Sequence, residues 1–202
     1  MNSHPKLVLA SASPRRRELL AQLGIRFAVV AGNAPEELLP GESPEQHVVR
    51  LAGDKAREVA GRKEVSGRWF LGSDTIVLRD ETLLGKPRDA AEAAAMLRSL
   101  SGRSHRVLSG YAVLDRDSGV NLAGAVATTV RCKELTDQEI AGYIATGEPF
   151  DKAGAYAIQG IGAFMVRSIE GSYSNVVGLP LCEVVDLLER LGAIRLFEVP
   201  LP

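Results

Sequence analysis

The chain has 202 residues and an almost balanced charge, with 24 Lys and Arg against 25 Asp and Glu and a net charge of -1. Because 46% of the residues are hydrophobic and 24% are charged, the composition is that of a globular protein and excludes a mainly disordered chain. The neutral balance also argues against a general nucleic-acid binder, which needs a basic excess to neutralise phosphates.

The first third of the chain alternates short apolar runs with helix start signals. Residues 6–10 and 26–31 have the composition of strands. Ser13-Pro14 provides an N-cap and a first helical residue for a helix that ends at Gly24. Ser43 to Gln46 form a capping box, which predicts a second helix that extends to about Gly61.

The remainder of the chain is richer in strand patterns. Strands are expected over residues 69–78, 82–84, 106–115, 123–133, 154–162 and 164–169. Helices are expected over residues 89–100, from a capping box at Thr136 to Gly147, and over residues 181–191. No repeat or linker interrupts this order. We therefore expect a single α/β domain over residues 1–202, with a mixed sheet and flanking helices.

Three consecutive arginines, Arg15 to Arg17, stand at the start of the first expected helix, directly after Ser11 and Ser13. A helix N-terminus has free N–H groups and a positive dipole end, so cations there are unfavourable unless an anion binds. The pattern therefore indicates a phosphate-binding turn. A solvated arginine face is the alternative, since successive helical residues cannot all point one way.

Two charged residues fall in apolar surroundings. Lys55 lies on the apolar stripe of the second expected helix, where a lysine is either paired or extends its head to solvent. Asp74 interrupts the apolar strand of residues 69–78, and an unpaired buried carboxylate costs several kcal/mol. Asp74 therefore predicts a metal ion, a cationic partner or a strand end at a cleft. An aspartate that caps a turn beside Gly72 is the alternative.

Two further cations, Lys86 and Lys152, occupy short loops beside small residues, where a backbone can approach a ligand closely. With Arg15 and Lys55 they suggest a cationic pocket for a polyphosphate.

The acidic residues that could hold the accompanying Mg²⁺ through oxygen ligands are Glu36, Glu37, Asp74 and Asp89. The histidines and cysteines show no metal-ligand spacing; they are His4, His47, His105, Cys132 and Cys182. No signal peptide or membrane-length apolar run of roughly 20 residues is present, so we expect a cytoplasmic protein without a membrane partner.

Taken in order, these motifs resemble those of the Maf-type nucleoside triphosphate pyrophosphatases. The similarity extends from Leu9 to about Glu183. Each motif alone is a weak signal, but the ordered series is specific. It comprises residues 9–16, 41–44, 50–56, 72–77, 85–87, 100–102, 147–156, 159–160 and 175–180.

The resemblance implies an enzyme that hydrolyses a nucleoside triphosphate to the monophosphate and pyrophosphate with Mg²⁺ or Mn²⁺. It also implies an elongated α/β fold with a central nucleotide-binding cleft, akin to inosine triphosphate pyrophosphatases. The Tyr156-Ala157-Ile158-Gln159-Gly160 context is similar to the family branch that acts on dTTP and UTP. Two alternatives stay open: a pyrophosphatase for 7-methyl-GTP or purine nucleotides, and a non-catalytic nucleotide sensor that regulates septum formation.

The resemblance also assigns roles by position. Asp74 matches the family's proton acceptor and, with Glu36, is the expected metal site. The substrate-binding set is Ser11, Ser13, Arg15, Lys55, Thr75, Lys86, Lys152 and Gln159, in which Arg15, Thr75 and Gln159 match the positions for substrate choice. Family members usually carry an Asp-x-Asp-Glu pattern where this chain has Asn33-Ala34-Pro35-Glu36, so the loop supplies fewer carboxylates here. A homodimer, the clearing of modified pyrimidine nucleotides and an influence on cell division are further expectations.

Overall fold

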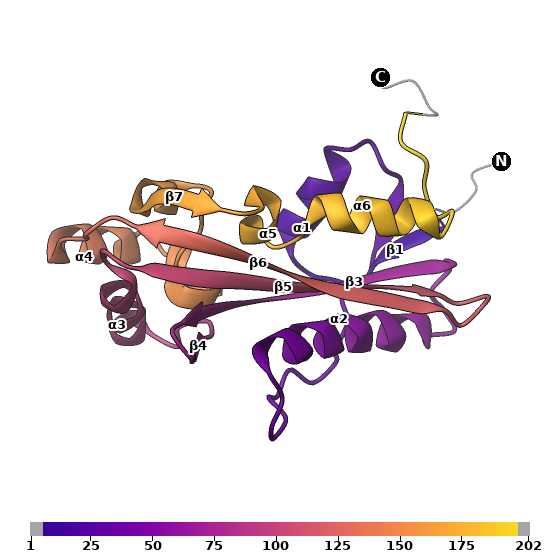
Figure 1. The fold of residues 1–202 in the computed structure, drawn as a ribbon, viewed down its shortest axis with the longest axis horizontal. Helices are drawn as coiled ribbons and strands as arrows, with labels where there is room; N and C mark the ends of the chain where they lie inside the picture. Colours follow the sequence, from indigo (N-terminus) through magenta and orange to yellow (C-terminus); the bar gives the residue numbers. More distant parts are fainter. Residues whose placement is uncertain (1–5, 198–202) are drawn as a thin grey trace. The chain divides into compact units, whose positions relative to one another are not determined.

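The computed structural model describes residues 6–197 and contains one mixed sheet of seven strands (Figure 1). The strand order is β2-β1-β3-β5-β6-β7, and β4 pairs with β3. Strand β1 is parallel to both β2 and β3, whereas β4 is antiparallel to β3 and β7 is antiparallel to β6. The strands are β1 (Leu7–Leu9), β2 (Phe27–Val29), β3 (Trp69–Arg79), β4 (Thr82–Leu84), β5 (Ser104–Asp115), β6 (Asn121–Cys132) and β7 (Val166–Glu170).

The helices flank this sheet, and three of them begin where the capping signals at Ser13, Ser43 and Thr136 predict. Ser43 and Thr136 both form complete capping boxes, and the Ser13 hydroxyl accepts a hydrogen bond from the Arg16 backbone N–H. The α-helices are α1 (Pro14–Ala21), α2 (Pro44–Ala60), α3 (Ala90–Leu100), α4 (Asp137–Ala145), α5 (Tyr173–Val177) and α6 (Leu181–Arg190). The expected mixed α/β class with flanking helices is therefore confirmed. None of the helices within residues 6–197 combines the length and apolarity that a membrane crossing requires.

The chain divides into two compact units. The first unit comprises Met1–Asp74, Ser109–Val126 and Gly178–Pro202. Its apolar core is built around Val8, Val59 and Phe70. A Cβ at Gly110 would meet the Val48 carbonyl of α2, whereas the hydroxyl of the neighbouring Tyr111 lies in the field of α6 carboxylates. Because successive strand residues point to opposite faces, α2 and α6 cover opposite faces of the strands in this unit (Figure 1).

The second unit comprises Thr75–Leu108 and Ala127–Val177. Its core joins α3 and α4 to the strands through Leu97, Leu100, Val107 and Ile140. Three short 3₁₀ helices complete it: η1 (Glu148–Asp151), η2 (Ala153–Ala155) and η3 (Ile161–Met165).

The strand expected over residues 154–162 is wrong. The region instead forms the 3₁₀ turns η2 and η3, because Gly154 and Ala155 both have positive φ, at 69° and 60°. A strand requires negative φ, and alanine pays a steric cost in the left-handed region that only local packing can offset. The strand expected over residues 164–169 is present as β7, which begins two residues later, and α5 was not anticipated.

Candidate active site

Asp74 comes from β3, whose residues from Trp69 to Asp74 are all buried. Asp74 is 8% exposed. An ionised carboxylate at such a depth requires a cation or hydrogen-bond donors, because burial disfavours its charge. In the first unit that partner is the Lys55 ammonium group, whose Nζ lies 2.6 Å from Asp74 Oδ1.

Lys55 reaches Asp74 because α2 lies unusually close to β3. A Cβ atom on Gly72 would lie 2.0 Å from the Ala52 carbonyl oxygen and 2.9 Å from the Ala56 nitrogen. Only a glycine permits that approach. Lys55 stands between these two alanines on the buried face of α2, so the close contact brings its side chain to the strand position two residues after Gly72.

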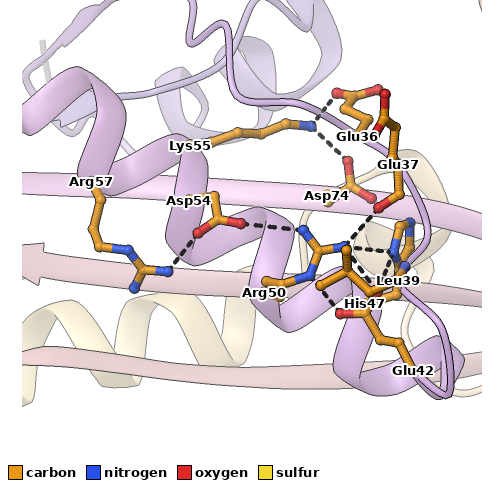
Figure 2. A network of polar contacts seen from close by, with 10 residues as sticks. All are labelled: Glu36, Glu37, Leu39, Glu42, His47, Arg50, Asp54, Lys55, Arg57 and Asp74. Carbon is orange, nitrogen blue, oxygen red and sulfur yellow. Dashed lines mark hydrogen bonds and ion pairs between the residues drawn. The ribbon is translucent and has the colours of Figure 1, made fainter.

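Glu36 supplies a second carboxylate to the same ammonium. Its Oε1 lies 2.6 Å from Lys55 Nζ, and its side chain is 63% exposed, against 11% for Asp74. Figure 2 shows the two carboxylates turned toward the ammonium from a strand and from a loop. We refer to Glu36, Lys55 and Asp74 as the ionic triad. With one positive and two negative groups, the ionic triad carries a net charge of about -1, which favours a further cation.

The loop that carries Glu36 is fastened to α2 by Arg50. The Nε and Nη2 atoms of Arg50 donate to the two oxygens of Glu42 at 2.5 and 2.8 Å, and Nη2 also donates to the Glu37 carbonyl at 2.8 Å (Figure 2). His47 Nδ1 lies 3.0 Å from the same Glu42 carboxylate. The hydrogen bonds from Arg50 dominate and lower the pKa of Glu42 to about 2. Arg50 therefore holds the loop at Glu37, the residue next to Glu36.

The start of α1 is organised by the hydrogen bonds of the Arg16 side chain. The Arg16 guanidinium donates to the Ser73 and Gly178 carbonyls at 2.8 Å each and to the Ser11 hydroxyl at 3.1 Å. Burial has the largest effect on the pKa of the Arg16 guanidinium and lowers it, while the nearby Asp74 carboxylate acts to raise it.

Sequence reasoning treated the three arginines alike and missed this positioning role. Arg16 connects the first helical turn to the residue directly before Asp74. Arg15 is half-buried and Arg17 is exposed, so the three side chains have different surroundings. The available signal was the unfavourable position of a cation at a helix N-terminus, which for Arg16 is offset by the Ser73 and Gly178 carbonyl oxygens.

The second unit contains the other expected substrate residues. Gly154 N–H donates to the Gly85 carbonyl at 3.0 Å, which places the loops of Lys86 and Lys152 side by side. Lys86 is exposed, whereas Lys152 binds the Glu148 carbonyl at 3.0 Å and pairs with Asp151.

Thr75 and Gln159 are both half-buried in this unit. Asp89, a possible metal ligand from sequence, caps α3 by accepting a hydrogen bond from the Glu92 N–H at 2.8 Å. Because a cap uses the carboxylate locally, Asp89 has an evident structural role.

Glu36 and Asp74 carry the carboxylate oxygens that a divalent cation prefers. The two carboxylates lie near one another, since each places an oxygen 2.6 Å from the Lys55 nitrogen, so a metal ion would bind beside this ammonium. Within residues 6–197, no cluster of three or more His, Cys, Asp and Glu side chains is arranged for a metal ion. Mg²⁺ commonly uses only one or two carboxylates together with substrate phosphates and water. The two residues therefore fit a metal that arrives with its substrate.

Comparison with known sequences places this arrangement in a family. Residues 6–191 match the sequence profile described as Maf-like protein. The chain belongs to the Maf family. The match covers every residue of the ionic triad and both loops of the second unit that carry Lys86 and Lys152.

Several curated Maf-family relatives are similar over nearly their full length. A protein from Syntrophotalea carbinolica named dTTP/UTP pyrophosphatase is 70% identical over 97% of this chain and 89% of its own length. A protein of the same name from Geobacter sulfurreducens is 58% identical over 94% of this chain and 98% of its own. Among solved structures, a nucleoside-triphosphatase / dITP/XTP pyrophosphatase from Mycobacterium abscessus aligns at 15% identity with a TM-score of 0.41, covering 92% of this chain and 93% of that one.

Proposed function

We propose that this protein hydrolyses dTTP and UTP to the nucleoside monophosphate and pyrophosphate. The observation that carries the proposal is the ionic triad, in which a buried carboxylate and an exposed one share a single ammonium. Relatives at 58% and 70% identity bear the name dTTP/UTP pyrophosphatase, which supports this substrate class.

The reaction requires water to attack the α-phosphorus, while the bond between the α-phosphorus and the oxygen that bridges it to the β-phosphate breaks. Asp74 would accept the proton of that water, and pyrophosphate would leave with the bridging oxygen. Since Oδ1 of Asp74 accepts the Lys55 hydrogen bond, the other carboxylate oxygen is the one that would take the proton. Lys55 therefore holds the orientation of the base in addition to contributing charge.

Negative charge that develops on the phosphates needs cations nearby. Lys55 and Arg15 would neutralise phosphate oxygens, and the Ser11 and Ser13 hydroxyls would donate to them. The residues that would hold a divalent metal are Glu36 and Asp74. When bound, Mg²⁺ or Mn²⁺ supplies positive charge to the phosphates and increases the acidity of a bound water.

The family resemblance assigns substrate choice to Arg15 in the first unit and to Thr75 and Gln159 in the second. Gln159 carries both a donor and an acceptor, which matches a pyrimidine edge, and Thr75 is small enough to leave space for the ring. Lys86 and Lys152 are proposed phosphate contacts from the adjacent loops of that unit. Single substitutions at Gln159, Thr75, Lys86 and Lys152, each assayed for pyrophosphate release, test these assignments one at a time.

The first test is a panel of nucleoside triphosphates assayed for pyrophosphate release with Mg²⁺ and with Mn²⁺. We expect dTTP and UTP to be cleaved with the highest kcat/KM. Preferential cleavage of 7-methyl-GTP or of purine nucleotides would overturn the pyrimidine assignment. Tight triphosphate binding with negligible turnover would instead favour a nucleotide sensor. The panel can include modified pyrimidine triphosphates, since the sequence predicts a clearing role.

The second test is Asp74→Asn, which preserves shape but removes the proton acceptor. We expect kcat to fall by about 10²- to 10⁴-fold, with nucleotide binding largely retained. The matched control is Asp80→Asn at an exposed turn of the second unit, which should keep the parental rate. A parental rate for Asp74→Asn would rule out Asp74 as the base.

A further inference from the structure

The carboxylate of Glu148 is surrounded by hydrogen-bond donors, and no role is assigned to it above within the motif of residues 147–156. It follows Gly147 at the start of η1 and is half-buried. Oε1 accepts hydrogen bonds from the Tyr143 hydroxyl and the Gly162 N–H, both at 2.9 Å, and Oε2 accepts one from the Ile161 N–H at 3.0 Å.

These donors determine the charge state of Glu148. Burial alone would raise its pKa, but the hydrogen bonds from Gly162, Ile161 and Tyr143 outweigh burial and hold the pKa below its usual value. Glu148 is therefore an ionised carboxylate at neutral pH. Charge-assisted bonds to backbone N–H groups are stronger than neutral ones, so the segment that supplies these N–H groups is held firmly.

That segment is the loop that carries Gln159. Glu148 binds its C-terminal side, at Ile161 and Gly162. Tyr143 binds the N-terminal side of this loop through a hydrogen bond from the Ala157 backbone to its hydroxyl. That hydrogen bond lowers the pKa of the Tyr143 hydroxyl, whereas burial and the Glu148 carboxylate raise it, so that the pKa lies above its usual value. The Tyr143–Glu148 pair thus contacts both ends of a loop in which Gln159 is the middle residue.

We propose that Glu148, assisted by Tyr143, is a positioning residue for base selectivity. It fixes the backbone of residues 157–162, so that the Gln159 amide is presented in one orientation to the pyrimidine edge. This inference rests on the proposed function, because it assumes that Gln159 reads the base. A side-chain amide can discriminate between bases only if its donor and acceptor are held in a defined direction.

The decisive variant is Glu148→Gln, because its amide nitrogen would face a backbone N–H where the carboxylate oxygen now accepts a hydrogen bond. We expect kcat/KM for dTTP and UTP to fall by about tenfold, mainly through KM, and the preference for dTTP over dGTP to fall with it. Hydrogen exchange at the Ile161 and Gly162 amides should become faster. The control is Glu139→Gln in the same unit, whose carboxylate pairs with Lys133 and caps α4.

Tyr143→Phe removes one donor and should cause the same change to a smaller extent, so the test survives if Glu148→Gln fails to fold. Equal losses toward dTTP and dGTP in both variants would mean a merely structural role and would overturn the inference, as would parental kinetics in both. If the parent enzyme itself does not cleave dTTP or UTP, the proposed function fails. The exchange rates would still report whether Glu148 holds the loop.

Discussion

Asp74 in the first unit and Glu148 in the second are both shielded carboxylates, but their partners differ in kind. Asp74 is bound by the Lys55 ammonium, which it shares with Glu36. Glu148 is bound by two backbone N–H groups and a tyrosine hydroxyl. An ammonium on a flexible stem can exchange a carboxylate for a phosphate, whereas backbone donors cannot move without local unfolding. This difference supports the proposed roles, in which Asp74 acts as the base and Glu148 holds the loop of Gln159.

After the loss expected for Asp74→Asn, the largest effect comes from removing the ammonium of the first unit. Lys55→Gln should lower the rate of pyrophosphate release by about 10²- to 10³-fold, because the phosphates lose a cation and Asp74 loses its orienting hydrogen bond. Lys63→Gln at an exposed position is the matched control and should retain the parental rate. The view of Asp74 as a carboxylate available for chemistry would be broken if Lys55→Gln were as active as this control.

The next expected effect concerns the close contact that creates the ionic triad. Gly72→Ala should lower the free energy of unfolding by about 3 kcal/mol and reduce activity, because its Cβ would meet the Ala52 carbonyl and force α2 away from β3. Urea denaturation and a pyrophosphate-release assay measure the two effects.

The matched control is Gly53→Ala on α2, whose added Cβ would meet only the mobile end of the Arg57 side chain. Alanine favours a helix interior, so this change should alter stability by less than about 1 kcal/mol. Equal stability of the two variants would contradict the close-contact explanation.

Sequence reasoning found Lys55 and Asp74 as anomalies and Glu36 as a possible metal ligand, but it could not determine that the three bind one another. Asp74 in an apolar strand and Lys55 on an apolar helical stripe each required a partner. The identity of that partner depends on the short distance between α2 and β3, which Gly72 permits. In the sequence, Gly72 was placed within the expected strand, with a turn beside it as the alternative. A glycine in a strand can mark a bulge, a bend or a close backbone contact, and only the packed structure shows that Gly72 allows a close contact.

The second unit was harder to predict because its site loops are irregular. The apolar run over residues 154–162 favoured a strand, yet Gly154 and Ala155 adopt positive φ and end that pattern. Glu148 lies in the family motif of residues 147–156, but no role was assigned to it, because a glutamate after a glycine gives no local signal of its partners. Its importance comes from donors located 13 and 14 residues later, a separation that no local pattern encodes.

A smaller effect concerns His105, a buried histidine of the second unit. His105 Nε2 lies 2.6 Å from the Tyr156 hydroxyl, and burial lowers the pKa of His105 to about 4. The unfolded chain binds a proton near the usual histidine pKa of about 6.5, while the folded chain does not. Stability should therefore decrease as pH falls from about 6.5 toward 4, by about 2 kcal/mol at pH 5.

Urea denaturation between pH 7 and pH 5 measures this slope. His105→Gln should flatten it, because the variant no longer has an imidazole that protonates on unfolding. An unchanged slope in His105→Gln would show that other groups cause the acid sensitivity.

The smallest expected effect tests whether the first unit also needs a rigid scaffold around its exposed carboxylate. Arg50→Lys keeps the charge but cannot bind both Glu42 oxygens and the Glu37 carbonyl together, so the loop that carries Glu36 should loosen. We expect kcat/KM to fall by about threefold and the Mg²⁺ concentration for half-maximal activity to rise. Arg57→Lys is the control, since Arg57 is half-exposed and binds only Asp54 among the residues of Figure 2. Identical metal titrations for the two variants would mean that Glu36 reaches its position without the Arg50 contacts. The loop of Glu36 would then differ from the loop held by Glu148 in its mobility as well as in the charge of its partners.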